Sequence, residues 1–238
     1  MSMKKIMTRF DFSKDPLLTA NIENSLRQGS GDILEDSAEG IFLYDREGHV
    51  FCLYAPTELG KAWLRKHEAL GYELLILYDD ALIAYAAETY GLTIDEKCRQ
   101  VVWTAAEPPL CTNSLSVRAA SEEDIDLCLR VYRHSSEEDI RKAVGAGNVL
   151  LGYEGEQFAG MIGLHSEGSI GMLEVLPAYR RKGYGAELEK AMIASRLRKG
   201  CIPFAHVYLS NAASLALQEH IGMACSEGTL TWLFPEEE

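Results

Sequence analysis

The stretch of sequence that decides the fold is Leu173-Glu-Val-Leu-Pro-Ala-Tyr-Arg-Arg-Lys-Gly-Tyr-Gly-Ala186. It predicts an apolar strand that stops at Pro177, a tight basic turn, and a helix that begins near Gly183. Glycine lets a ligand approach the backbone closely, and the N–H groups of a first helical turn have no intrahelical partner. Three consecutive cations, residues 180–182, stand here in a chain with a net charge of −13. The stretch therefore predicts an anion site, and a diphosphate is the obvious candidate.

The pattern Arg180-x-x-Gly183-x-Gly185 resembles the pyrophosphate turn of the GNAT superfamily of N-acetyltransferases. By itself a glycine-rich turn with solvated cations is weak evidence. A second pattern, Val207-Tyr-Leu-Ser-Asn211-x-x-Ser214-x-x-Leu217-x-x-x-x-Gly222, resembles the strand and helix that follow this turn in the family. The two motifs, in the right order and at the right spacing, extend the resemblance over residues 114–234, about half of the chain.

The order of predicted elements agrees with this resemblance. Residues 107–113 contain two prolines and predict a linker, because proline disfavours both helix and central strand. After it we expect a strand, two helices, three antiparallel strands, and then helix, strand, helix and strand. This order implies an α/β protein with a mixed sheet, with the acyl-CoA N-acyltransferase (GNAT) fold in residues 114–238.

Residues 1–106 are interpreted as a degenerate GNAT-like companion domain. When Gly91 is placed over Gly222, Glu88 falls over Glu219, and both halves then continue into a strand that ends near a tryptophan. The alternative is that two αβ units share only their hydrophobic period. At the position of the basic turn the first half has Pro56-Thr-Glu-Leu-Gly-Lys61, without the paired glycines and the cluster of cations. We therefore expect no cofactor in the first half.

Composition limits the class of protein. Apolar residues make up 47% of 238 residues, but no run approaches the ~20 needed to cross a membrane. The six cysteines are scattered without a Cys-x-x-Cys pair, so we expect neither a metal site nor a disulfide framework. The acidic balance argues against a nucleic-acid surface. These features predict a cytoplasmic protein with no membrane and no nucleic acid among its partners. We also expect the protein to be a monomer or homodimer.

The resemblance implies an acetyl-CoA-dependent N-acetyltransferase whose acceptor is a primary amine, in a small molecule or at a peptide N-terminus. The resemblance also implies that the backbone N–H of Val175 donates a hydrogen bond to the acyl carbonyl, and that pantetheine lies along the same strand. By strand alternation Leu173 and Val175 share one face, and Met172 and Glu174 share the other. The implied cofactor-binding residues are Leu173, Val175, Arg180, Arg181, Lys182, Gly183, Tyr184, Gly185, Asn211 and Ser214.

Glu174 is the candidate general base. A carboxylate in the middle of an apolar strand is unusual because burying charge is costly. The alternative is that Glu174 forms an ion pair with a neighbouring basic residue. His165 is the competing base, since imidazole suits proton transfer near neutral pH, and its alternative is a histidine that faces solvent. His206, in an apolar run, is interpreted as a core histidine.

Gln218 stands where the family commonly has a tyrosine as general acid. An amide cannot give up a proton at neutral pH, although it can donate a hydrogen bond to a thiol. Asn211, which precedes the same predicted helix, is expected to cap it and to contact pantetheine at its side. The departure at Gln218 keeps a second hypothesis open: a catalytically inactive acyl-CoA-binding or interaction module of the same fold.

Overall fold

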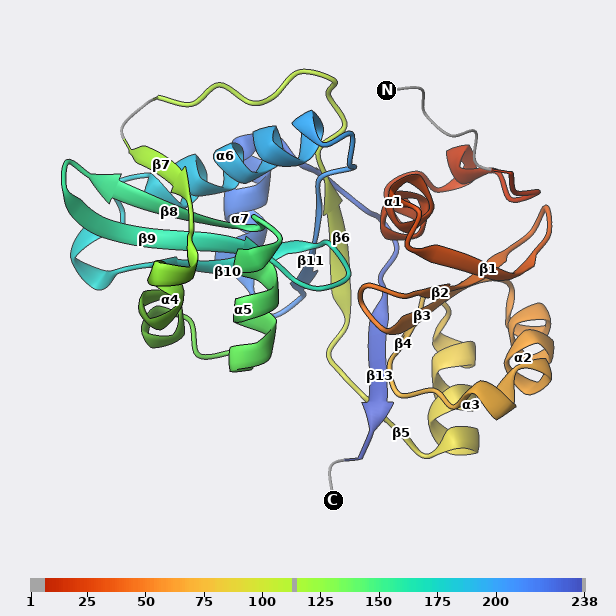
Figure 1. Ribbon diagram of the computed structural model, residues 1–238. Helices are drawn as coiled ribbons and strands as arrows, with labels where there is room; N and C mark the ends of the chain where they lie inside the picture. The colour runs from red at the N-terminus through yellow and green to blue at the C-terminus, as the bar shows by residue number, and fades with distance from the viewer. Residues whose placement is uncertain (1–6, 113–114, 237–238) are drawn as a thin grey trace. The chain divides into compact units, whose positions relative to one another are not determined.

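The computed structural model describes residues 7–112 and 115–236, so the predicted linker's Asn113 and the following Ser114 lie outside the described residues. Packing divides the chain into two compact units (Figure 1). Unit 1 consists of Met1–Val101, Val207–Ala212 and Cys225–Glu238, and unit 2 of Val102–His206 and Ala213–Ala224. The two units are thus each assembled from separate stretches of sequence. The domain boundaries expected from the sequence, with one domain at residues 1–106 and the other at 114–238, stay a prediction.

Unit 1 is built on a six-stranded mixed sheet in the order β1-β2-β3-β4-β13-β5. Its strands are β1 Gly31–Asp36, β2 Ile41–Asp45, β3 Val50–Tyr54, β4 Leu75–Leu77, β5 Leu92–Ile94 and β13 Thr231–Pro235. Its helices are α1 Ala20–Gln28, α2 Thr57–Lys66 and α3 Asp80–Tyr90. Strands β3 and β4 are parallel, as the connection through α2 requires, and the other pairs are antiparallel.

Both faces of this sheet are covered by helices. Leu75 and Leu77 of β4 are fully buried on the face that packs against α2 and α3. Ile76, between them in sequence, is buried on the opposite face with Ile22 of α1. This alternation along a short strand is what a sheet with two covered faces requires.

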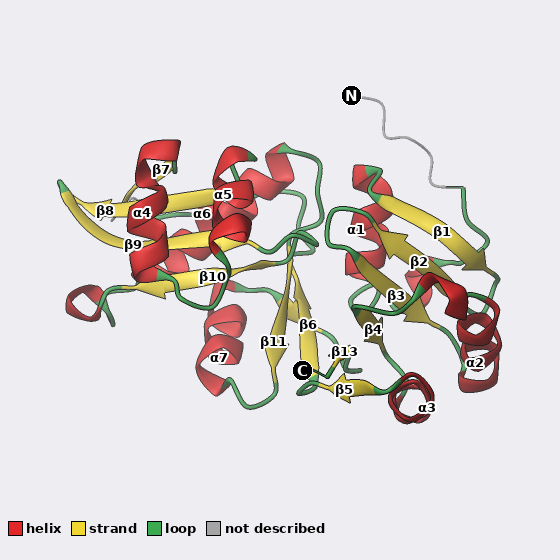
Figure 2. Ribbon diagram, turned by 60° about the horizontal axis from the view of Figure 1, so that its bottom comes forward, coloured by secondary structure: helices red, strands yellow, loops and turns green. Residues whose placement is uncertain are grey.

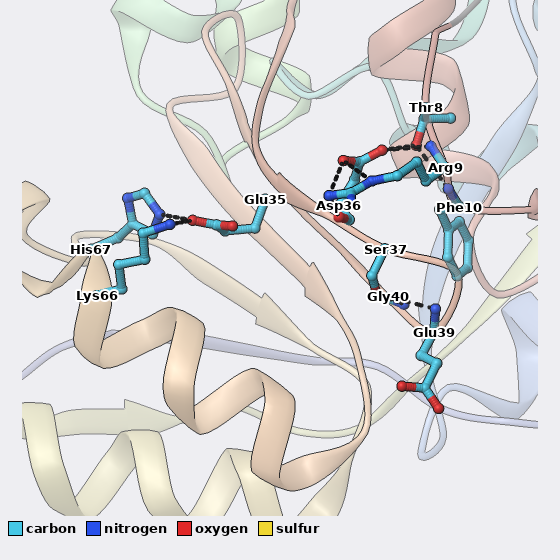
Figure 3. Close-up of polar contacts among 10 residues, drawn as sticks. All are labelled: Thr8, Arg9, Phe10, Glu35, Asp36, Ser37, Glu39, Gly40, Lys66 and His67. Carbon is cyan, nitrogen blue, oxygen red and sulfur yellow. Dashed lines mark hydrogen bonds and ion pairs between the residues drawn. The ribbon is translucent and has the colours of Figure 1, made fainter.

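The edge strand β1 is held at its end by two carboxylates (Figure 3). Glu35 accepts hydrogen bonds from Lys66 and, at 2.8 Å, from His67 Nε2. Asp36 accepts one from the backbone N–H of Arg9 at 2.5 Å. The hydrogen bond from Lys66 lowers the pKa of Glu35, and the one from the Arg9 backbone lowers the pKa of Asp36. These contacts attach the end of α2 and the segment before α1 to the edge of the sheet.

Unit 2 contains a four-stranded antiparallel sheet in the order β10-β9-β8-β7 (Figure 2). Its strands are β7 Ser116–Ala119, β8 Val149–Glu154, β9 Gln157–Leu164 and β10 Ile170–Val175. Its helices are α4 Ile125–Val131, α5 Glu137–Gly145, α6 Tyr184–Arg198 and α7 Ala212–Ile221, of which α7 begins at the last residue assigned to unit 1. A capping box is present at Ser121, and Ser136 caps α5.

The core of unit 2 lies between the sheet and the helix pair α4–α5, where Met161, Met172 and Ile140 are buried together. On the other face α6 packs so closely that a Cβ added to Gly152 of β8 would lie 3.0 Å from Leu188 of α6. The predicted α/β class with a mixed sheet is therefore confirmed, since the sheet of unit 1 is mixed, and the antiparallel sheet of unit 2 lies between two helical layers.

A third sheet has three strands in the order β11-β6-β12, with β6 Cys98–Val102, β11 Phe204–Tyr208 and β12 Ala224–Cys225. Strand β6 is the last strand of the first half of the sequence, yet it lies between two strands of the second half. Strand β13 is the last strand of the second half, yet it lies between β4 and β5 of the first half. The two halves have thus exchanged their last strands, which the sequence patterns did not predict.

Helix α6 carries a buried carboxyl group. Glu189 is 2% exposed, and its hydrogen-bond partner is Gln218 of α7, which is also buried. Burial raises the pKa of Glu189 to about 7, and the hydrogen bond from Gln218 opposes this rise. One oxygen of each side chain has no hydrogen-bond partner among the described residues. The ionised form of Glu189 is therefore costly in the folded protein.

We expect Leu233→Ala in β13 to lower the free energy of unfolding by about 2–5 kcal/mol, because Leu233 is fully buried in the core of unit 1. The matched control is Ile94→Ala. Ile94 is the cross-strand neighbour of Leu233 but is 48% exposed, so its loss should cost less than about 1 kcal/mol. Chemical denaturation measures both, and equal losses would contradict the placement of β13.

Stability should also depend on the protonation of Glu189. Its folded pKa of about 7 lies above the ordinary value of 4.5, so the unfolded chain loses this proton first. The contribution of Glu189 to stability is therefore complete below pH 4.5 and is lost as pH rises to about 7. Glu189→Gln should match the wild type at pH 4.5 and exceed it by up to about 3 kcal/mol at pH 8. Denaturation at both pH values tests this, with the exposed Glu219→Gln as control.

Candidate active site

The strand β10 forms one end of the sheet in unit 2 and, among the described strands, pairs only with β9. It contains a bulge: Gly171 lies opposite Gly163 and Glu174 opposite Met161, so β10 has one extra residue. The bulge is accommodated by Met172, whose φ is 47°. Met172 is buried in the core beside α4 and α5. Glu174, opposite Met161 of the same core, faces that side as well.

The other face of β10 carries the apolar side chains that the resemblance assigns to the cofactor. A Cβ added to Gly185 of α6 would lie 3.8 Å from Leu173 and 3.9 Å from Val175. It would also lie 3.9 Å from Leu217 of α7. Leu173 and Val175 therefore share the face that meets the start of α6, as alternation predicts.

Gly160 on β9 determines how closely the end of β10 can approach. A Cβ at this position would clash with the carbonyl oxygen of Glu174 and lie 3.0 Å from Cα of Val175. The next pairing contact is the hydrogen bond from Leu176 N to Ala159 O, at 2.9 Å. Gly160 was not among the predicted site residues, although a glycine inside a predicted strand is typical of close backbone approach.

The basic turn connects β10 to α6 through two residues with left-handed backbone. Arg181 has a φ of 60° and Gly183 a φ of 82°. Gly183 is the N-cap of α6, and no side chain caps the helix. The N–H groups of the first turn consequently remain available as donors at the positive end of a 15-residue helix. A Cβ added to Gly183 would meet no atom within 4 Å, so the backbone is open on this side.

Two of the three cations of the turn are paired with carboxylates. Arg180 Nη2 lies 2.9 Å from Glu174 Oε1, and its Nε donates to the carbonyl oxygen of Val175 at 3.0 Å. Lys182 Nζ lies 3.1 Å from both carboxylate oxygens of Glu154 on β8. Arg181 is exposed and forms no ion pair within the described part of the chain.

Tyr184 contributes its side chain as well as its backbone to this arrangement. Its hydroxyl donates to Glu154, and this bond, followed by that from Lys182, lowers the pKa of Glu154. The ammonium of Lys182 lies 5.1 Å from the ring centroid of Tyr179 and 5.7 Å from that of Tyr184. Glu154 thus orients two residues of the turn. No sequence pattern marked it, because it stands in a hairpin that is far from the turn in sequence.

The two candidate bases are not brought together. Glu174 is half-buried, and its charge, after burial itself, contributes to the raised pKa of Tyr132 at the end of α4. The ring of His165 instead lies over Gly171, where an added Cβ would overlap it. Gly171 and Glu174 are three residues apart on β10, or roughly 10 Å along a strand. Burial lowers the pKa of His206 to about 3, and the charge of the neighbouring His165 is the second cause of this lowering.

The structure turns Gln218 toward the interior. This side chain is 4% exposed and is bonded to Glu189, so its amide does not face solvent as a free donor. Asn211 immediately precedes α7, and its N–H donates to Tyr208 O at 3.0 Å, while Ser214 lies in the first turn of α7. The predicted contacts of Asn211 and Ser214 with pantetheine stay predictions.

The residues of the turn fit the diphosphate of a coenzyme A. The uncapped start of α6 supplies N–H donors, Gly183 leaves the backbone accessible, and residues 180–182 supply positive charge. Within the described residues no group of His, Cys, Asp or Glu side chains could hold a metal ion. None of the described helices is both long enough and apolar enough to cross a membrane.

Comparison with known proteins agrees with this geometry. Residues 149–232, from β8 into β13, match the family model described as FR47-like protein. No curated protein matches the chain. Among solved structures, a GCN5-related N-acetyltransferase from Kribbella flavida is 14% identical with a TM-score of 0.57, and 92% of this chain covers 94% of that one.

Two further solved structures have similar folds. A GCN5-related N-acetyltransferase-like protein from Streptococcus suis is 19% identical with a TM-score of 0.54, and 89% of this chain covers 91% of it. A protein from Drosophila is 20% identical with a TM-score of 0.63, and 83% of this chain covers 74% of it. The chain therefore has the fold of the GCN5-related N-acetyltransferases, and its residues 149–232 match the related FR47-like family.

Proposed function

We propose that the protein is an N-acetyltransferase that uses acetyl-CoA and acetylates a primary amine of a small molecule or of a peptide N-terminus. The observation that carries the proposal is the turn at residues 180–185: an uncapped helix start, an accessible Gly183 and three cations, directly after the end strand β10. A diphosphate matches this combination of donors and charge.

In this proposal the cofactor supplies an acetyl group as a thioester, and the protein supplies position and charge. The first-turn N–H groups of α6, with residues 180–182, hold the diphosphate. Leu173 and Val175 offer an apolar surface to pantetheine. The backbone N–H of Val175 holds the acyl carbonyl, which stabilises charge that develops on its oxygen. Positioning the two reactants is the main contribution that such a transfer needs.

Glu174 is proposed to accept the proton of the acceptor ammonium on its carboxylate. It faces the side of the sheet that α4 and α5 cover, and Tyr132 of that layer is close enough to respond to its charge. His165 lies near His206 instead, which makes it the weaker candidate. Protonation of the departing thiolate is assigned to water, because Gln218 is committed to Glu189.

A non-catalytic acyl-CoA-binding module is the second candidate function. One observation favours it: the helix position that commonly supplies the acid carries a buried amide bonded to Glu189. Release of free thiol from acetyl-CoA across a panel of amines separates the two functions, since a binding module binds acetyl-CoA but releases none.

Unit 1 is proposed not to bind the cofactor. Its corresponding helix α2 follows Pro56, and Glu58 in its first turn pairs with Lys61 at 2.9 Å. Gly60 faces the interior, where an added Cβ would lie 2.5 Å from Leu82. A cytoplasmic location, the monomeric or homodimeric state, and the absence of membrane and nucleic-acid partners stay predictions.

We expect Gly183→Ala to raise the Kd for coenzyme A about tenfold or more, because the added methyl group projects from a backbone that must approach the diphosphate. Gly200→Ala is the matched control. Gly200 follows the other end of α6, also has a positive φ, 72°, and also has no atom within 4 Å of an added Cβ. Both variants therefore bear a similar backbone strain, and calorimetry should show weaker binding in Gly183→Ala only.

Glu174→Gln should lower kcat/KM for an amine acceptor by about 10²–10⁴, the usual cost of losing a general base. The substitution keeps the shape of the side chain and removes its ability to accept the proton. Glu156→Gln, in an exposed hairpin turn, removes the same charge and should leave kcat/KM unchanged. An unaltered rate in Glu174→Gln would exclude this residue as the base. His165 would then be the candidate base, and kcat/KM of His165→Asn would test it.

A further inference from the structure

The cations that would hold a diphosphate are partly neutralised by the protein itself. Residues 180–182 carry three positive charges, and Glu174 and Glu154 bring two carboxylates into direct contact with them, at 2.9 Å and 3.1 Å. A phosphate that uses these cations has to share them with a carboxylate or replace it. The two carboxylates therefore compete with the ligand for the cations and help to set how tightly this turn binds it.

Arg180 is paired with Glu174, the residue that is also proposed as the general base. Its guanidinium donates from Nη2 to Glu174 and from Nε to the carbonyl oxygen of Val175, so two of its five N–H groups are directed at β10. A phosphate binds a guanidinium best through two parallel hydrogen bonds. Reorientation of Arg180 toward a phosphate breaks its contact with Glu174.

The ion pair is suited to exchange rather than to permanent anchoring. The Arg180 side chain is 58% exposed and that of Glu174 is 31% exposed. Exposed ion pairs contribute little to stability, because water screens the charges and two flexible side chains must be ordered. The carboxylate of Glu154, in contrast, is held by the Tyr184 hydroxyl as well as by Lys182.

We infer that Glu174 is the internal partner of Arg180 and that the diphosphate of the cofactor displaces it, so that cofactor binding releases the carboxylate toward the acceptor. This inference rests on the proposed function. It gives Glu174 a positioning role for Arg180 in addition to its role as base. It also couples the two ligands, since Arg180 belongs to the turn that is proposed to bind the cofactor, and Glu174 lies on the side of α4 and α5, where the acceptor is proposed to bind.

The coupling has a defined sign. An acceptor ammonium that pairs with Glu174 leaves Arg180 to the phosphate, so each ligand favours the binding of the other by the same factor. With no cofactor bound, Arg180 and the ammonium compete for one carboxylate.

Calorimetric titration with coenzyme A tests the inference without any measurement of activity. Glu174→Gln removes the internal competitor, so it should tighten coenzyme A binding about two- to fivefold, the range expected for an exposed ion pair. In an Arg180→Gln background the same substitution should change the Kd by less than about 1.5-fold. Glu156 lies two residues from Glu154 and forms no ion pair among the described residues. Glu156→Gln removes the same charge as Glu174→Gln and should also leave the Kd unchanged.

The outcomes are distinct. Tightening in Glu174→Gln that disappears in the Arg180→Gln background supports the inference. Unchanged or weaker binding in Glu174→Gln overturns it, and so does tightening that persists without Arg180, because the effect is then one of net charge. Both of these results leave the proposed function intact. A wild-type protein that does not bind coenzyme A overturns the proposed function and the inference together.

Discussion

The left-handed backbone at Gly183 is the constraint on which the candidate site depends. At a φ of 82° a residue with a Cβ is strained, and glycine is not. This conformation lets the chain pass from the end of β10 into α6 within a few residues and without a side-chain cap. Because this turn is tight, it brings the end of β10 close to the clustered cations and to the uncapped N–H groups of α6. An ordinary capped helix start would satisfy the same donors internally.

The features that could be predicted from the sequence are those that depend on neighbours in the chain. The hairpins, the capping box at Ser121 and the basic turn are local patterns, and the structure contains each of them. Helix α1 was not predicted, because three of its buried residues are Asn21, Asn24 and Ser25, and the apolar period that indicates a helix is absent. Strand β1, Gly-Asp-Ile-Leu-Glu-Asp, is equally polar at an edge.

The parts of the site that could not be predicted depend on contacts between distant residues. Strand alternation predicted the faces of residues 172–175, but the bulge at Met172 is set by the pairing of β10 with β9. The ion pair of Glu174 was one of two alternatives, and only the position that Arg180 takes within the turn decides that it forms. Gln218 was expected to face the cofactor. Its burial with Glu189 results from the packing of two helices, which no local pattern contains.

The position of β13 has a consequence for how the protein folds as it is synthesised. Residues 75–77 and 92–94 pair with residues 231–235, so the sheet of unit 1 cannot be complete until the ribosome has translated more than a hundred further residues. Pairings between such distant residues slow folding, because a long loop must close before they form. In the meantime β4 and β5 present unpaired edges, which are prone to aggregate. The growing chain therefore passes through a stage in which β4 and β5 lack the partner strand that lies between them in the complete sheet.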